Sequence, residues 1–248
     1  MVLTNSLKKK IRSLQQLKFR QKYNNFIAEG PKICTEYLKG VKYKIEHIIC
    51  TEDHFEAHED LLQAYSGKTI ITNDKDLEFI SALKHPNKIL IVCEGTDNKM
   101  PNAVRKGSDW VVYLDDIRDP GNMGTIIRIA DWFGIKWIVS SPESVDYYNP
   151  KVIQSSMGSH NRVGLFINDL DNVHKYYKDS YGMSLDGTPL NDLGQKDPGI
   201  IIIGNEARGI NSKWDKIITK KVRIEGDGGA ESLNASIACA IACYRLLN

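Results

Sequence analysis

Four consecutive isoleucines, Ile200 to Ile203, end at Gly204, and the polar residues Asn205 and Glu206 follow directly. An uninterrupted β-branched run of this length is typical of a parallel strand that helices cover on both faces. Open α/β sheets bind their ligands at the carboxyl ends of such strands. A strand that ends in glycine is common in itself, so ordinary turn chemistry is the alternative. The run predicts a parallel α/β sheet with polar groups along one edge.

A similar arrangement occurs between residues 109 and 133. An apolar strand at Val111–Leu114 precedes the turn Asp119-Pro120-Gly121-Asn122, and a helix is expected from about Met123 to Phe133. Arg128 lies on that helix, and its planar guanidinium could clamp a phosphate or a ribose oxygen near the turn. The alternative is a helix cap with an ion pair from Arg128 to Asp131 or Asp119.

A glycine-rich loop separates Ile224 from the last expected helix, which runs from about Leu233 to Leu246. Ser232 precedes this helix as a candidate N-cap, and Asn234 falls in its first turn, where its amide can extend from the helix end. The glycines resemble a phosphate-binding loop only superficially, because no Gly-Lys-Ser/Thr follows them. Nucleoside triphosphate hydrolysis is therefore disfavoured.

Together, the segments DPGNMGTIIRIADWFG, IIIIGNEARG and ESLNASIACAIACY resemble the three signature motifs of the SpoU (TrmH-like) RNA ribose 2′-O-methyltransferases of the SPOUT superfamily. Order, residue types and spacings agree at once, which makes chance agreement improbable. The resemblance is strongest from Asp109 onward. Nearer the start, RQKYNNFIAEGPKICTEYL is similar to the substrate-binding domain, related to RNA-binding ribosomal proteins, that many members carry. One departure is Ile224-Glu225-Gly226, where the family usually has Ile-Pro-Met.

The resemblance implies an α/β fold whose C-terminal, mostly parallel sheet has helices on both faces and contains a deep trefoil knot. It further implies S-adenosyl-L-methionine bound in the knot, no metal, and a homodimer through the knotted domain. The implied catalytic residues are Asn122, Arg128, Glu206, Ser232 and Asn234. The implied cofactor-binding residues are Gly204, Ile224 and Leu233, with Leu185 at the neighbouring strand end. Arg128 would position the ribose hydroxyl or accept its proton.

Residues 1–95 alternate short apolar runs with helical patterns and predict a separate small α/β domain. The polar segment 96–108 has no apolar period and predicts a linker to a second domain at 109–248. The first 44 residues contain eleven Lys and Arg but only two Asp and Glu. Such a cluster suits phosphate neutralisation on an RNA-binding surface, and the alternative is a solvated helix face.

Other features limit the class of protein. No apolar run approaches the ~18 residues of a membrane span, and the five cysteines are scattered, so a cytoplasmic location is predicted without disulfides or a zinc ribbon. His54 and His58 have zinc-ligand spacing but lack the accompanying glutamate, and they are interpreted as exposed helix residues. Asp115 and Asp116 could suggest a metal site, but no third ligand follows at a regular spacing.

The sequence therefore predicts an S-adenosylmethionine-dependent RNA ribose 2′-O-methyltransferase. Ribosomal RNA is favoured over transfer RNA because the N-terminal domain resembles that of ribosomal members. A rival is an RNA-binding protein that has kept the fold and lost turnover, suggested by the altered Glu225-Gly226 loop. An ordinary Rossmann methyltransferase is disfavoured, because no GxGxG follows the first strand.

Overall fold

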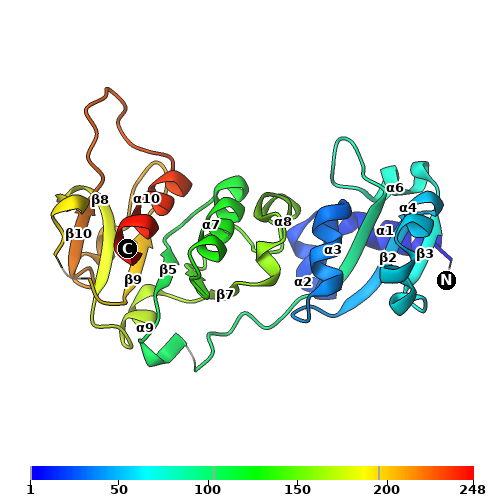
Figure 1. Cartoon of the computed structure of the whole chain (residues 1–248), viewed down its shortest axis with the longest axis horizontal. Helices are drawn as coiled ribbons and strands as arrows, with labels where there is room; N and C mark the ends of the chain where they lie inside the picture. Colours follow the sequence, from blue (N-terminus) through cyan, green and yellow to red (C-terminus); the bar gives the residue numbers. More distant parts are fainter. Residues whose placement is uncertain (1, 103, 195) are drawn as a thin grey trace. The chain divides into compact units, whose positions relative to one another are not determined.

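The computed structural model describes residues 2–102, 104–194 and 196–248, which form two compact units (Figure 1). The first unit holds the chain up to Asp97 together with Asp146–Asn161. The second holds Asn98–Val145 and Arg162–Asn248. A segment from the middle of the chain thus packs with the first unit.

The first unit is built on a four-stranded sheet of order β1-β4-β2-β3, in which only β2 and β3 are parallel. The strands are β1 (Asn25–Glu29), β2 (Ile45–Thr51), β3 (Thr69–Thr72) and β4 (Ile89–Glu94). The helices are α1 (Asn5–Ser13), α2 (Leu17–Tyr23), α3 (Pro31–Lys39), α4 (Glu52–Ala57), α5 (Glu59–Leu62) and α6 (Asp74–Ile80), with a 3-10 turn at Gln63–Tyr65. The predicted alternation of strands and helices is therefore present.

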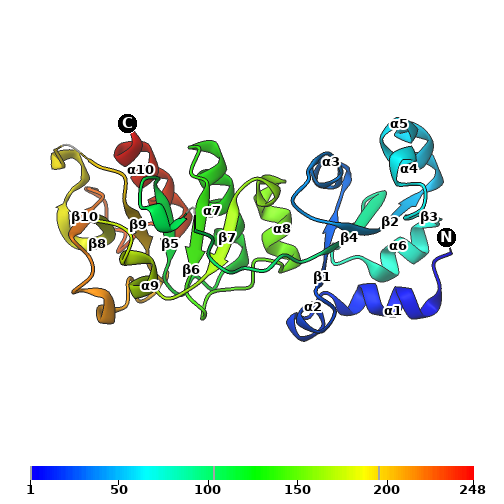
Figure 2. The same cartoon turned by 90° about the horizontal axis from the view of Figure 1, so that it is seen from below.

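Helices lie on both faces of this sheet (Figure 2), and an apolar layer fills each side. On one face α3 and α5 pack against side chains such as Phe26 and Ile91. On the other face α1 and α6 pack against Ile27 and Val92. Because alternate residues of a strand point to opposite faces, the neighbours Phe26 and Ile27 supply different layers.

The basic cluster at the front of the chain is divided between surface and interior. Arg20 is buried; its Nε donates to Asp146 Oδ2 and its Nη1 to the Leu14 carbonyl, each at 2.8 Å. Lys8 pairs with Asp76 at 2.6 Å. The exposed basic side chains are those of Lys9, Arg12, Lys18, Lys22, Lys32, Lys39 and Lys44. The cluster is thus partly structural, because buried Arg20 secures the segment that begins at Asp146.

That segment contains α8 (Pro150–Ser156) and a 3-10 turn at Ser159–Asn161. His160 is completely buried against the aromatic rings of the first unit, and its Nδ1 forms a 2.8 Å hydrogen bond with the Tyr37 hydroxyl. Lys42 Nζ donates to the His160 carbonyl at 2.8 Å. Residues 146–161 therefore complete the core of the first unit.

The second unit contains a six-stranded sheet of order β10-β8-β9-β5-β6-β7, in which every pair is parallel. The strands are β5 (Val111–Leu114), β6 (Trp137–Ser140), β7 (Gly164–Ile167), β8 (Ser180–Pro189), β9 (Ile200–Ile203) and β10 (Lys220–Arg223). The helices are α7 (Pro120–Trp132), α9 (Leu170–His174) and α10 (Ala235–Leu247), with 3-10 turns at Val104–Lys106, Leu190–Asp192 and Ser212–Trp214. The predicted parallel sheet is confirmed.

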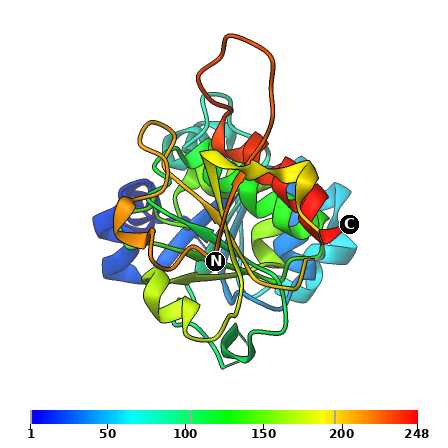
Figure 3. The same cartoon turned by 90° about the vertical axis from the view of Figure 1, so that its left-hand side faces the viewer.

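Helices cover both faces of this sheet. Alternate strand residues such as Tyr113 and Ile202 pack with α9. On the other face α7 packs against β6, and α10 packs against β9 and α7. The loop between β10 and α10 projects away from these layers (Figures 1 and 3).

Two expectations need correction. Part of the predicted linker belongs to the second core, because Met100 and Val104 are buried there; Ala103 lies outside the described residues. His54 is buried, although an exposed side chain was expected, and its ring stacks on that of His58 with centroids 4.2 Å apart. Both errors arise because short polar-looking segments gave no sign of the apolar surface against which they fold.

Candidate active site

Side chains from all three motifs meet in one hydrogen-bonded chain. Asn122 Nδ2 donates to Glu206 Oε1 at 2.8 Å, and Asn234 Nδ2 donates to Asn122 Oδ1 at 2.9 Å. These residues are far apart in sequence but lie in the same unit. The Asn122 side chain is nearly buried, and both its amide nitrogen and its amide oxygen have hydrogen-bond partners, as buried polar groups require. The chain Glu206–Asn122–Asn234 is the centre of the candidate active site.

Local sequence explains how each member is held. Asp119 caps α7 by accepting from the Asn122 backbone N–H at 2.8 Å, and Pro120 occupies the first helical position. Asn234 caps α10, because its Oδ1 accepts from the N–H groups of Ser236 and Ile237. The expectation that Ser232 is this N-cap was wrong. Asn234 serves better because its two-ended amide caps the helix and still donates to Asn122.

The loop after β9 presents Glu206 through a compact turn. Asn205 Oδ1 accepts from the backbone N–H groups of Ala207 and Arg208, and the Asn205 backbone pairs with that of Gly209. Gly204 is required at the strand end, since a Cβ there would lie 2.3 Å from the Gly209 carbonyl carbon. The glycine-then-acid pattern therefore reflects a tight backbone approach as well as a place for a carboxylate.

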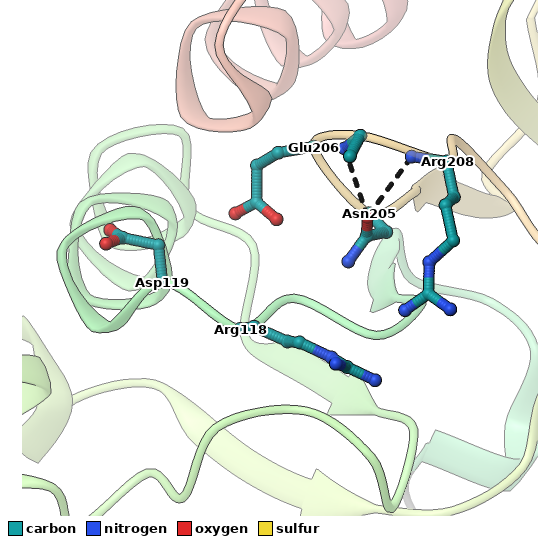
Figure 4. A pocket seen from close by; sticks show the side chains of 6 residues that line it. Arg118, Asp119, Asn205, Glu206 and Arg208 are labelled. Carbon is teal, nitrogen blue, oxygen red and sulfur yellow. Dashed lines mark hydrogen bonds between the residues drawn. The ribbon is translucent and has the colours of Figure 1, made fainter.

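An open pocket adjoins this turn and is lined by Arg118, Asp119, Asn205, Glu206, Ala207 and Arg208 (Figure 4). The Asp116 carboxylate pairs with Arg118 at 2.8 Å and with Arg208 at 2.5 Å. Sequence reasoning did not select these two arginines, and it considered Asp116 only as a metal ligand. Their positions in the loops that follow β5 and β9 were the available signal, because ligands bind at strand ends.

Arg128 and Ser232 do not join the chain of hydrogen bonds. Arg128 is exposed and, among the residues that the structure describes, has no ion pair. The ion pair between Arg128 and Asp131, considered as an alternative, is not formed. Asp131 pairs instead with Arg162 at 2.8 Å. Ser232 lies in the exposed loop that precedes α10. The structure thus brings together three of the five predicted catalytic residues.

Two family models match this chain. The model of the SpoU rRNA Methylase family matches residues 109–244, and that of the MRM3-like substrate binding domain matches residues 5–91. The first match alone covers more than half of the sequence. The chain belongs to the SpoU rRNA methylase family.

Individual relatives of this SpoU protein agree over nearly its whole length. It is 29% identical, across 95% of its own chain and 93% of the relative, to the Bacillus subtilis 23S rRNA (guanosine(2553)-2′-O)-methyltransferase RlmP. A TrmH-family structure from Porphyromonas gingivalis is 30% identical, with 98% of each chain covered and a TM-score of 0.84. The AdoMet-bound rRNA methyltransferase of Sinorhizobium meliloti is 26% identical, with 98% and 95% covered and a TM-score of 0.84.

Three of the four residues expected to bind the cofactor lie on or directly after the neighbouring strands β8, β9 and β10 of the SpoU domain. Gly204 directly follows β9 and Ile224 directly follows β10, on either side of β8. Leu185 lies where β8 departs from its regular pairing with β10, and its side chain is 68% exposed. Leu233, just before α10, is 47% exposed. Parallel strands end at the same edge, so Gly204 and Ile224 mark one side of the sheet.

Both aspartates at the end of β5 are engaged by groups of the protein. Asp115 accepts hydrogen bonds from the Asn211 backbone N–H at 2.7 Å and from Trp214 Nε1 at 3.1 Å. Asp116 is engaged by its arginines. Across residues 2–102, 104–194 and 196–248, no cluster of three or more potential metal ligands occurs. In the same ranges no helix is long and apolar enough to cross a membrane.

Proposed function

We propose that this protein transfers a methyl group from S-adenosyl-L-methionine to a ribose 2′-hydroxyl in ribosomal RNA. Membership of the SpoU rRNA methylase family supports the reaction class. The observation that carries the proposal is the Glu206–Asn122–Asn234 chain, because it joins the three motifs at the edge where parallel sheets bind ligands. The near full-length similarity to RlmP favours a ribosomal target over transfer RNA.

Methyl transfer requires an in-line approach of the 2′-oxygen and removal of its proton. When bound, the cofactor supplies the electrophilic methyl group. Glu206 and Asn234 hold Asn122 rigidly, so this chain presents fixed polar groups to an incoming ribose. Arg128 and Ser232 are proposed to complete the site, with Arg128 positioning the ribose through its planar guanidinium. The hydroxyl that reacts exists in RNA and not in DNA.

The proposed cofactor site uses Gly204, Ile224, Leu233 and Leu185. Leu185 and Leu233 are exposed apolar side chains that adenosine could cover. Ile224 and Gly204 would offer backbone groups at adjacent strand ends. A deep trefoil knot in this domain is part of the proposal, supported by the strand order β10-β8-β9-β5-β6-β7 and by family membership.

A homodimer through the face of α7 and α10 is also proposed. Trp132, Ile237 and Tyr244 on these packed helices are 84%, 50% and 61% exposed. Clustered exposed apolar side chains are typical of interaction surfaces. Arg128 lies one turn before Trp132 on the same side of α7, so such a dimer would place it beside the partner subunit.

Light scattering during gel filtration tests the dimer. The wild-type protein should have twice the monomer mass, and Trp132→Glu should shift it toward the monomer. Val41→Glu, at a fully exposed apolar position of the other unit, is the matched control. A monomeric wild-type protein would refute this part of the proposal.

The first unit is proposed to bind the RNA substrate, in keeping with its match to the MRM3-like substrate binding domain. Its exposed lysines and Arg12 supply the positive charge that phosphate contacts need. A cytoplasmic location is also proposed. All five cysteines are free and buried, which agrees with a compartment that keeps thiols reduced.

The deciding experiment maps ribose methylation by mass spectrometry in RNA from cells with and without the gene. One ribosomal nucleotide should lose its 2′-O-methyl group in the deletion strain and regain it on complementation. Loss in transfer RNA instead would select the alternative substrate. Calorimetry with S-adenosylmethionine tests the inactive rival, because a protein that binds RNA but not the cofactor has lost turnover.

A further inference from the structure

Asp116 is unusually constrained for a loop position, and its side chain is only 18% exposed. Its backbone φ of +58° lies in the left-handed region that residues other than glycine rarely adopt. Its N–H donates to Ser141 Oγ at 3.0 Å, and its carbonyl accepts from Asn205 Nδ2 at 2.8 Å. Backbone strain that the surroundings maintain in this way is often found at binding sites. The constraint fixes where the Asp116 carboxylate points.

That carboxylate holds two arginines by one N–H each. Arg118 uses its Nε and Arg208 uses one Nη, and the two side chains are 62% and 64% exposed. A guanidinium has five N–H donors, so most donors on each remain available to a ligand. Two positive charges share one negative charge, and the group therefore keeps a net charge of +1.

The group lies beside the candidate active site. Arg118 and Arg208 line the same pocket as Glu206 (Figure 4). Glu206 in turn binds Asn122. The loop that carries Arg208 and Glu206 is tied to Asp116 by Asn205, so the arginines and the chain Glu206–Asn122–Asn234 keep a fixed relation.

We infer that Arg118, Asp116 and Arg208 form a clamp for a phosphate of the substrate RNA, next to the ribose that is methylated. The inference rests on the proposed function and adds the binding site for the target nucleotide. Paired guanidinium forks match the tetrahedral oxygens of a phosphodiester, and every ribose in RNA adjoins such a group. Asp116 acts as a positioning residue that prepares both forks before RNA arrives.

The double variant Arg118→Ala/Arg208→Ala tests the clamp in steady-state methylation of ribosomal RNA. The KM for RNA should rise at least tenfold, while the dissociation constant for S-adenosylmethionine, measured by calorimetry, should change less than threefold. The slope of log affinity against log salt should become shallower by about 0.7 for one lost phosphate contact. Arg105→Ala, which removes an exposed arginine elsewhere in the same unit, is the control and should do neither.

Asp116→Asn separates positioning from charge, because asparagine tolerates the left-handed backbone but cannot hold two cations. Charge alone predicts tighter RNA binding, since the variant loses a negative charge and its net charge rises by one. The clamp predicts a KM raised about threefold or more despite that gain. Tighter binding, or an unchanged KM in the double arginine variant, would overturn the inference.

Weaker S-adenosylmethionine binding in the double variant would also overturn it, by showing that the arginines hold the cofactor carboxylate. Failure of the proposed function is a separate result, because the wild-type protein would then methylate no RNA under any condition. Equilibrium binding of RNA by the same variants would still test the clamp in that case.

Discussion

Asn234 combines a structural and a functional contact in one side chain. Its Oδ1 caps α10, while its Nδ2 donates to Asn122. Asn234→Asp should keep the cap, since aspartate is an equally good N-cap, but lose the donor. Asn234→Ala should lose both and cost about 1 kcal/mol of stability. We expect methyl transfer to fall by at least tenfold in both variants and thermal stability to fall mainly in the alanine variant. Equal activity of Asn234→Asp and wild type would remove the chain from the mechanism.

Because the Arg128 side chain is exposed, its substitution should change catalysis with little effect on the stability of the fold. Arg128→Ala should reduce single-turnover methyl transfer by at least a hundredfold, with cofactor affinity within a few fold, because its proposed role concerns the ribose and not the methyl donor. Arg128→Lys keeps the charge but not the planar fork, and it should recover little activity. A fully active alanine variant would exclude Arg128 from catalysis.

At the scale of elements, the segment 146–161 carries no recognisable motif, yet it packs into the core of the first unit. Burial, reinforced by the nearby Lys42 ammonium, lowers the pKa of the His160 imidazole well below its usual range. Below about pH 6.5 the unfolded chain binds a proton that buried His160 does not, so the free energy of unfolding should fall as the solution is acidified. The effect is bounded at about 1.4 kcal/mol per pH unit for one proton.

Urea unfolding between pH 7 and pH 5 measures this dependence. His160→Gln should lose less stability on acidification than wild type does, whatever its stability at pH 7. His85→Gln removes an exposed imidazole from the same unit and is the matched control. Parallel curves for wild type and His160→Gln would contradict the assignment.

For the whole molecule, RNA affinity should depend on charges of the first unit as well as on the unit that holds the candidate active site. Lys9, Lys18 and Lys22 are exposed on the first unit, and replacing all three with glutamine should lower the salt slope of RNA binding by up to about 2. The kcat at saturating RNA should stay near wild type. Lys175, Lys178 and Lys216, exposed on the second unit, provide a triple control of equal charge. An equal loss in both variants would show a nonspecific charge effect.

Deletion of the N-terminal residues is a poor test of RNA binding in this protein. Removing residues 1–97 would leave α8 and His160 without the sheet that buries them. Substitutions on the surface of the intact chain therefore test RNA binding more cleanly than a deletion would.

Much of the architecture could be predicted from local patterns. The isoleucine run before Gly204 predicted a buried parallel strand, and the turn Asp119-Pro120-Gly121-Asn122 predicted the helix that the structure has as α7. In the site, the resemblance of the three motifs to the SpoU signatures pointed to Asn122, Glu206 and Asn234, which the structure joins by hydrogen bonds. Such patterns succeed because burial periodicity and turn chemistry are properties of a few neighbouring residues.

By itself, the sequence determined the family, the parallel sheet and the polar residues at its edge. Only the tertiary structure decided that Asn234 rather than Ser232 caps α10, that Arg20 and His160 are buried, and that Asp116 holds two arginines. Each of these residues has at least one partner remote along the chain: Asn122 for Asn234, Asp146 for Arg20, Tyr37 for His160 and Arg208 for Asp116. Whether a side chain is buried or paired depends on which surfaces folding brings together. Local sequence spacing does not specify those tertiary contacts.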